Sequence, residues 1–287
     1  MEVKKVCVLG AGTMGNGITQ LLALSGYDVA MRDIEDRFVQ NGLNVIKGNL
    51  QRFFVAKEKM TQDEADKVLG RIKGTTDLKE AVAGAQVVIE SIVEVLSLKQ
   101  QVFKELDKLC APEVILATNT SSLSITEIGS QCQHQERVIG MHFFNPATVM
   151  RLVEIIRGAR TSDEAYNVIK ELSTKLGKEV ITVQKDAAGF IVNRIFLAIC
   201  NEASKLVYEG IATPEDIDKG CQLGLGHTMG PMRTMDLAGT DIVLHVMGIL
   251  QEEFGETFHI CPLIKRMVAA GELGVKAGKG FYDYSKK

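Results

Sequence analysis

The chain has 287 residues, of which 46% are hydrophobic and 24% charged, so it is long enough for one large or two modest domains and too apolar for extensive disorder. Its 33 Lys and Arg against 36 Asp and Glu give a net charge of −3, and it has no Trp; both features argue against a nucleic acid as partner. No apolar run approaches the roughly 20 residues of a membrane helix, no signal peptide is recognisable and the six cysteines are far apart, so we expect a cytoplasmic protein with reduced thiols and no membrane contact.

Five short runs rich in Val and Ile are predicted strands. Most of them are apolar at nearly every position, as strands buried on both faces of a parallel sheet are. Charged, helix-like stretches separate them, which predicts an α/β fold: a Rossmann-type, doubly wound and mostly parallel sheet. The five runs are Val6–Leu9, Asp28–Met31, Gln86–Glu90, Val114–Thr118 and Val138–Met141.

Residues 38–72 interrupt this alternation. The stretch is too long for a simple connection between strands, and its mixed charges and spaced apolar residues predict a helical hairpin. Two interpretations of the hairpin are open: a solvated helix pair, or a mobile arm over a ligand.

Strand signals end near residue 185, and helices are predicted beyond it. Phe190–Tyr208 reads as one long, mostly apolar helix. Thr213 and Pro214 have the pattern of an N-cap and first helical residue. Further helices are expected at about 236–253 and 262–271.

This change of pattern divides the chain into a Rossmann domain over 1–185 and an all-α domain over 186–287. A helix as apolar as Phe190–Tyr208 has no exposed polar face. We therefore expect it to be buried in its own domain or against another subunit, which favours a dimer.

The first predicted strand runs directly into a Gly-x-Gly-x-x-Gly motif, and a helix-like stretch follows. Gly10 allows the tight turn, Gly12 lets a pyrophosphate approach the backbone, and Gly15 lets the helix pack on the strand. The next strand ends near Asp33, whose carboxylate suits the ribose hydroxyls of NAD and repels the extra phosphate of NADP. The motif predicts NAD as cofactor; a glycine-rich turn without a ligand is the alternative.

His142 follows a predicted strand, at the edge of the sheet where ligands bind in doubly wound folds. Glu154 lies in a later apolar run, and a turn at Asn145-Pro146 lets it fold back towards His142. Such a pair fixes an imidazole for general-base catalysis. The alternatives are a purely structural His142 and a Glu154 that pairs with Arg151 or Arg157 at the surface.

A polar cluster, Thr118-Asn119-Thr120-Ser121-Ser122-Leu123, directly follows the fourth predicted strand. Because the carboxyl ends of parallel strands meet at one edge of a sheet, its hydroxyl and amide groups are placed to line the same crevice as His142. By itself, the cluster fits a helix N-cap and turn equally well.

Six motifs occur along the chain in this order: Gly10-x-Gly12-x-x-Gly15 with Asp33, Asn119-Thr120-Ser121-Ser122-Leu123, His142-Phe143-Phe144-Asn145-Pro146, Leu152-Val153-Glu154, Gly189-Phe190-Ile191-Val192-Asn193-Arg194 and Gly278-Lys279-Gly280-Phe281-Tyr282. Over essentially the whole chain they resemble the short-chain L-3-hydroxyacyl-CoA dehydrogenase family, and most closely its bacterial members that act on 3-hydroxybutyryl-CoA. The resemblance implies an oxidoreductase that interconverts a (S)-3-hydroxyacyl-CoA and a 3-oxoacyl-CoA by hydride transfer with NAD.

The resemblance also implies roles for residues around the substrate. His142 is the general base and Glu154 its orienting partner. Ser121 and Asn193 contact the substrate at its reacting oxygen. The arm over residues 38–72 meets the CoA moiety, and Lys57 is the residue expected at its phosphates, with Arg52 as the alternative.

On the cofactor side, the resemblance implies that Glu94 and Lys99 lie near the nicotinamide and that Asn145 and Lys276 also touch the cofactor. It implies a homodimer or a higher homo-oligomer. No metal site is expected, because the other four histidines are scattered. Departures from the family pattern, at Thr148, Thr228 and Arg233 among others, remove no group of this mechanism.

Two rival functions are kept. β-Hydroxyacid dehydrogenases also join a Rossmann domain to helices, but they act on free acids and use a catalytic Lys. Other relatives bind NADH without turning over a substrate. The His142-Glu154 pair and the arm that meets CoA argue against the first rival. The retained set of His142, Glu154, Ser121 and Asn193 argues against the second.

Overall fold

The structure is a computed structural model that describes residues 1–285. The chain divides into two compact units, Met1–Asp186 and Ala187–Lys287. Each unit has its own hydrophobic core. Within the described residues, no helix combines the length and the hydropathy needed to cross a bilayer.

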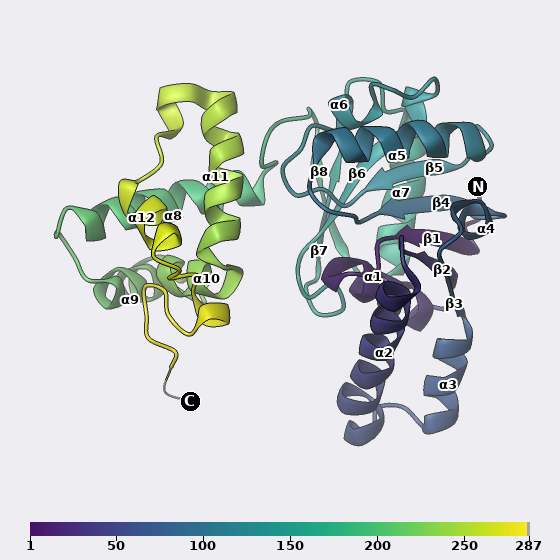
Figure 1. The fold of residues 1–287 in the computed structure, drawn as a ribbon, viewed down its shortest axis with the longest axis horizontal. Helices are drawn as coiled ribbons and strands as arrows, with labels where there is room; N and C mark the ends of the chain where they lie inside the picture. The colour runs from purple at the N-terminus through teal and green to yellow at the C-terminus, as the bar shows by residue number, and fades with distance from the viewer. Residues whose placement is uncertain (286–287) are drawn as a thin grey trace. The chain divides into compact units, whose positions relative to one another are not determined.

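An eight-stranded sheet forms the centre of the first unit (Figure 1), in the order β3-β2-β1-β4-β5-β6-β7-β8. All neighbouring strands pair in parallel except β6 and β7, which are antiparallel. The predicted Rossmann-type, mostly parallel sheet is therefore confirmed, and its order reverses between β1 and β4, where such sheets bind ligands. The strands are Lys5–Leu9 (β1), Asp28–Arg32 (β2), Ile72–Thr75 (β3), Val87–Glu90 (β4), Ile115–Thr118 (β5), Val138–Phe143 (β6), Leu152–Ile156 (β7) and Glu179–Val183 (β8).

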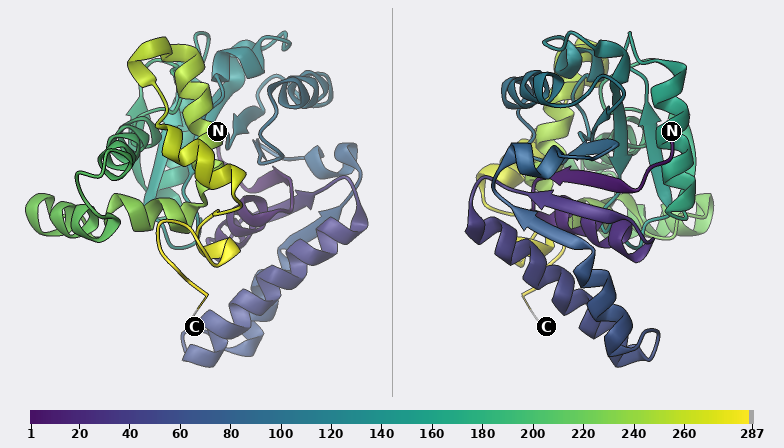
Figure 2. Two further views of the ribbon diagram at one scale, coloured as in Figure 1. Left: turned by 60° about the vertical axis from the view of Figure 1, so that its left-hand side comes forward. Right: turned by 90° about the vertical axis from the view of Figure 1, so that its right-hand side faces the viewer.

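Helices cover both faces of this sheet. Ile18 of α1 and Ile169 of α7 share one core with alternate strand residues such as Val8 and Ile89. Helices α5 and α7 lie on opposite sides of the sheet (Figure 2, right). The helical segments of this unit are Thr13–Leu24 (α1), Asp36–Phe53 (α2), Val55–Lys57 (η1), Gln62–Gly70 (α3), Leu78–Val82 (α4), Leu96–Leu109 (α5), Ile125–Gly129 (α6), Gln135–Arg137 (η2) and Asp163–Lys175 (α7).

Three of the eight strands lie outside the predicted set. β3 and β8 are the two edges of the sheet and are only partly buried, so they lack the continuous apolar run of a central strand. β7 coincides with the apolar run around Glu154 but enters the sheet as an antiparallel strand. β6 continues to Phe143, so His142 lies inside this strand rather than after it, which corrects the predicted strand end at Met141.

The predicted helical hairpin is present as α2 and α3, with η1 between them, and it projects away from the sheet (Figure 1). Thr61 begins α3 with a capping box. Its hydroxyl accepts a hydrogen bond from the Glu64 amide at 3.3 Å, and the Glu64 carboxylate accepts one from the Thr61 amide at 2.8 Å. Lys57, the expected CoA contact, ends η1 in the connection between the two helices.

Helices make up the second unit. As predicted, Thr213 caps the helix that starts at Pro214. The single helix expected at 236–253 is instead two, because Gly239 adopts a φ of +96° between them. The helical segments are Val192–Tyr208 (α8), Pro214–Leu225 (α9), Pro231–Ala238 (α10), Thr240–Phe254 (α11), Gly255–Phe258 (η3), Pro262–Ala269 (α12) and Val275–Ala277 (η4).

Helix α8 differs from its prediction. Leu197 and Cys200 face the core of the second unit, whereas Arg194 and Ile195 are exposed. The helix is therefore amphipathic and does have an exposed polar face.

The glycines near the C-terminus pack against a buried carboxylate. The Asp236 side chain accepts hydrogen bonds from the Phe281 and Tyr282 amides at 2.9 and 3.0 Å. A Cβ at Gly280 would lie only 2.0 Å from an Asp236 oxygen. The Gly-Lys-Gly-Phe-Tyr motif thus holds the C-terminal segment on α10 within the second unit.

Candidate active site

The glycine loop between β1 and α1 has two tight positions and one open one. A Cβ at Gly10, where φ is +100°, would lie 2.3 Å from the Ser91 carbonyl oxygen, and one at Gly15 would lie 1.9 Å from the Gly10 carbonyl oxygen. A Cβ at Gly12 would meet nothing within 4 Å. Gly12 is also the N-cap of α1, with no side-chain cap and no acid in the first turn. The loop therefore leaves the helix N-terminus open for an anionic group, as a pyrophosphate requires.

Asp33 follows β2 and turns its carboxylate to this loop. One oxygen accepts a hydrogen bond from the Ala11 amide and the other accepts one from the Ile34 amide, both at 2.7 Å. The Asp33 carboxylate thus places a negative charge beside the glycine loop, where it opposes a second phosphate and suits ribose hydroxyls. Loop and carboxylate together fit the adenosine half of NAD.

His142 and Glu154 lie directly opposite each other in the antiparallel pair of β6 and β7. The distance from His142 Nδ1 to Glu154 Oε2 is 2.7 Å, and both side chains are buried. The surface alternative is excluded, because Arg151 pairs with Glu179 at 3.0 Å and Arg157 with Asp163 at 2.6 Å. A carboxylate on Nδ1 favours the tautomer with its proton there and makes Nε2 the basic nitrogen.

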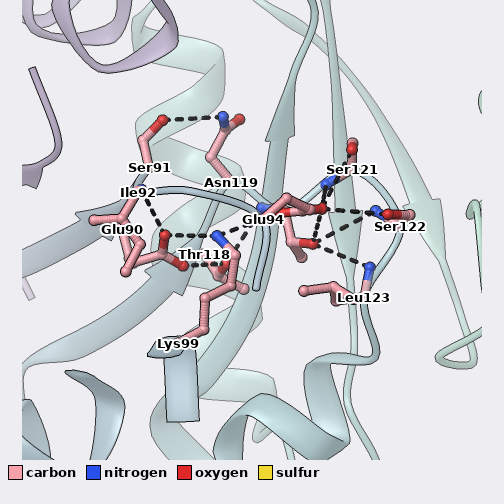
Figure 3. Close-up of polar contacts among 11 residues, drawn as sticks. Glu90, Ser91, Ile92, Glu94, Lys99, Thr118, Asn119, Ser121, Ser122 and Leu123 are labelled. Atoms are coloured by element: carbon pink, nitrogen blue, oxygen red, sulfur yellow. Dashed lines mark hydrogen bonds and ion pairs between the residues drawn. The ribbon is translucent and has the colours of Figure 1, made fainter. Parts of the chain in front are cut away.

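The polar residues after β5 gather around Glu94 (Figure 3). Glu94 Oε1 accepts hydrogen bonds from the Thr120 hydroxyl at 2.5 Å, from the Ser121 amide at 2.8 Å, and from the hydroxyls of Ser121 and Ser122 at 3.3 Å. Burial alone would raise the pKa of Glu94, but the Lys99 ammonium and these hydrogen bonds hold that pKa below its usual value. Glu94 is therefore an ionised anchor for the loop that carries Ser121.

Lys99 lies beneath Glu94, with only 1% of its side chain exposed. Its ammonium is 2.6 Å from Glu90 Oε1 and 3.3 Å from Glu94 Oε2. Glu90 is not among the predicted site residues, although an acid that ends an apolar strand, like Glu154 in its apolar run, is costly to bury without a partner.

Asn119 joins the carboxyl ends of three strands. Its side-chain oxygen accepts a hydrogen bond from the Phe143 amide of β6 at 2.9 Å, and its amide group donates one to the Ser91 hydroxyl, after β4, at 3.3 Å. Asn119 itself follows β5. The structure thus brings the polar cluster and the strand that carries His142 to the same edge of the sheet.

The remaining predicted residues lie elsewhere in the two units. Asn145 is exposed in the loop after β6, which the buried Lys178 ammonium holds by hydrogen bonds to the carbonyls of Ala147 and Met150 at 2.6 and 2.7 Å. In the second unit, Asn193 lies in the first turn of α8. Lys276, also in that unit, forms an ion pair of 2.6 Å with Asp241. Within the described residues, no group of three or more His, Cys, Asp and Glu is placed to hold a metal.

Comparison with known proteins identifies the family. Residues 5–187 match the family described as the NAD binding domain of 3-hydroxyacyl-CoA dehydrogenase, and residues 189–284 match its C-terminal domain. The chain belongs to the 3-hydroxyacyl-CoA dehydrogenase family. Its cofactor is accordingly NAD, as the glycine loop and Asp33 predict.

Relatives and solved structures agree with this assignment. The chain is 42% identical over 283 residues to a 3-hydroxybutyryl-CoA dehydrogenase of Clostridioides difficile, covering 98% of this chain and 100% of that one. It is 43% identical over 283 residues to one of Bradyrhizobium diazoefficiens, covering 98% and 96%. The crystal structure of (S)-3-hydroxybutyryl-CoA dehydrogenase from Ralstonia eutropha has a TM-score of 0.94 at 44% identity, covering 99% and 100%.

Proposed function

We propose that this chain interconverts (S)-3-hydroxybutyryl-CoA and acetoacetyl-CoA, with His142 as the general base. The observation that carries the proposal is the buried pair of His142 and Glu154, 2.7 Å apart at the ligand-binding edge of the sheet. The names of the relatives supply the acyl-CoA substrate.

In the oxidative direction, His142 takes the proton of the C3 hydroxyl, and Glu154 stabilises the imidazolium that forms. In the reductive direction, the protonated His142 returns this proton to the ketone oxygen. NAD, when bound, would supply the hydride chemistry at C3. Proton transfer of this kind contributes roughly 10²–10⁴-fold to the rate.

Other residues take the roles that the resemblance gives them. Ser121 and Asn193 bind the substrate at its reacting oxygen, where each lost donor costs about 3–4 kcal/mol in comparable sites. Glu94, Lys99, Asn145 and Lys276 serve the cofactor. Lys57, on the helical hairpin, binds the CoA phosphates.

We also propose where the enzyme works and how it assembles. We place the enzyme in the cytoplasm, in fatty-acid or butyrate metabolism, as a homodimer or higher homo-oligomer. The exposed apolar residues of the second unit support the dimer.

The test is the loss of NADH absorbance with acetoacetyl-CoA. The wild-type protein turns the substrate over, and His142→Gln lowers kcat at least about 100-fold with little change in NADH binding. The control is His134→Gln, since His134 is exposed and pairs with Glu136 away from the site. Near-normal turnover by His142→Gln would refute the base assignment, and activity on free 3-hydroxybutyrate alone would favour a β-hydroxyacid dehydrogenase.

A further inference from the structure

Strand β6 extends beyond its parallel neighbour β5. The last paired residues of the two strands are Thr118 and Gly140, whereas β6 continues to Phe143. The final residues of β6, which include His142, therefore lie past the paired part of β5. On the other side, β7 stays paired with β6 through Phe143 and Val153. The end of β6 that carries the proposed base thus has a strand partner on one side only.

The side chain of Asn119 takes the place of a strand on the β5 side. Asn119 directly follows β5, and its Oδ1 accepts a hydrogen bond from the Phe143 amide at 2.9 Å. Phe143 is only 2% exposed, so its N–H needs a partner inside the protein. Asn119 supplies that partner with a side-chain oxygen, a role that backbone carbonyls play along the paired part of the sheet.

Two further hydrogen bonds hold Asn119 in place. Its backbone amide donates to the Glu90 carbonyl at 2.7 Å, and its Nδ2 donates to the Ser91 hydroxyl at 3.3 Å (Figure 3). The partners also determine which way the side-chain amide points, because the Phe143 N–H can only donate and must therefore face the oxygen. The oxygen that holds β6 is thus anchored to the end of β4.

Fixing the Phe143 amide also constrains His142. The two residues share one planar peptide unit, so a hydrogen bond to its N–H limits the rotation of the backbone at His142. From the opposite strand, Glu154 Oε2 lies 2.7 Å from His142 Nδ1. The imidazole is held by Glu154 of β7 on one side, while Asn119 restrains its backbone from the other.

We propose that Asn119 is a positioning residue for the general base. Through the Phe143 amide it holds the part of β6 that β5 does not reach, and so keeps the His142 imidazole aligned between Glu154 and the substrate. It acts through the backbone and transfers no proton. This inference rests on the proposed function, in which His142 is the base.

Hydrogen exchange of single amides, followed by NMR in the protein without ligands, tests the contact directly. In Asn119→Leu, which keeps the size of the side chain and removes its oxygen, the Phe143 amide is expected to exchange about tenfold faster than in the wild type. Asn119→Asp keeps an acceptor for this amide, and the Ser91 hydroxyl can turn to donate to the carboxylate, so exchange at Phe143 should stay within about threefold of the wild type. Unchanged exchange in Asn119→Leu would overturn the proposal, as would equal acceleration in both variants.

Gln86→Leu is the matched control, because Gln86 makes the same kind of contact at the opposite edge of the sheet. Its side-chain oxygen accepts hydrogen bonds from the Lys4 and Lys5 amides, both at 2.9 Å, where β1 begins. This variant should speed exchange at Lys5 and leave both kcat and exchange at Phe143 within about twofold of the wild type. A loss of kcat equal to that of Asn119→Leu would mark a general loss of stability and overturn the proposal.

Steady-state kinetics separates positioning of the base from ligand binding. Asn119→Leu is expected to lower kcat for the reduction of acetoacetyl-CoA about tenfold, with KM and the Kd for NADH within about threefold of the wild type. When His142→Gln is already present, the same substitution should lower the remaining kcat less than about threefold, because the imidazole that it misplaces is gone. Equal losses in the two backgrounds would overturn the proposal, as would a large rise in the Kd for NADH with unchanged kcat.

Ser91→Ala serves if Asn119→Leu does not fold. It removes only the hydroxyl that orients the Asn119 side-chain amide. Exchange at Phe143 should rise about two- to threefold and kcat should fall, and the absence of both changes would overturn the proposal. An inactive wild-type protein would instead refute the proposed function, while the exchange rates would still show whether Asn119 holds the end of β6.

Discussion

Glu154 is the residue whose position depends most on strand direction. In an antiparallel pair, residues directly opposite each other project to the same face, so the His142–Glu154 contact follows from the register of β6 and β7. We expect Glu154→Gln to lower kcat about 100-fold or more, because an amide does not stabilise an imidazolium. Steady-state kinetics with acetoacetyl-CoA measures this change. Glu179→Gln, which alters an exposed ion pair on β8, is the control, and equal kcat values for the two variants would contradict the role of Glu154.

Asp33 is a second residue whose substitution has an expected effect, here on the choice between NADH and NADPH. Its carboxylate lies beside the glycine loop, where it accepts a hydrogen bond from the Ala11 amide at 2.7 Å. Asp33→Ala removes a charge that repels the extra phosphate of NADPH, so the preference for NADH over NADPH should fall. The ratio of kcat/KM for the two cofactors measures this preference. An unchanged ratio would show that Asp33 does not set cofactor choice.

The sequence supports some of these single-residue assignments better than others. The cost of burying an unpaired carboxylate predicts a partner for Glu154, but spacing along the chain does not choose between His142 and two nearby arginines. The strand pairing makes that choice. The same cost applies to Glu90, whose partners Lys99 and Thr118 are 9 and 28 residues away along the chain and meet it only in the folded unit.

At the scale of elements, burial decides what the sequence predicts. The five predicted strands, β1, β2, β4, β5 and β6, are interior strands with apolar runs, whereas the edge strands β3 and β8 are only partly buried. The single antiparallel pairing in the described sheet was not predicted, because an apolar run has no direction. The helical hairpin was predicted from its length and periodicity, which do not depend on burial in the sheet.

The helical hairpin is expected to contact the CoA phosphates through Lys57. Lys57 lies in η1, with its ammonium 5.8 Å from the centre of the Phe53 ring. If the hairpin binds the CoA phosphates, Lys57→Ala should raise KM for acetoacetyl-CoA about three- to tenfold and leave kcat unchanged, since an exposed charge-assisted contact is modest. The same variant should not change KM for an acetoacetyl thioester that lacks the CoA nucleotide. Lys175→Ala, which removes an exposed ion pair on α7, is the control, and an equal rise in KM there would contradict the assignment.

At the scale of the whole molecule, the second unit exposes apolar side chains on successive helices. Ile195 of α8, Leu223 of α9 and Leu237 of α10 are each more than half exposed, in contrast to the packed core of the same unit. Apolar exposure on this scale favours association with another chain.

We therefore expect light scattering to give twice the mass of the chain. A charge introduced at a buried apolar contact is costly, so Ile195→Asp and Leu223→Asp should shift the protein towards the single-chain mass. Val45→Asp, an exposed apolar position on α2 of the first unit, is the matched control and should keep the wild-type mass. A single-chain mass for the wild type would contradict the dimer. Dissociation by Val45→Asp alone would move the association surface to the first unit.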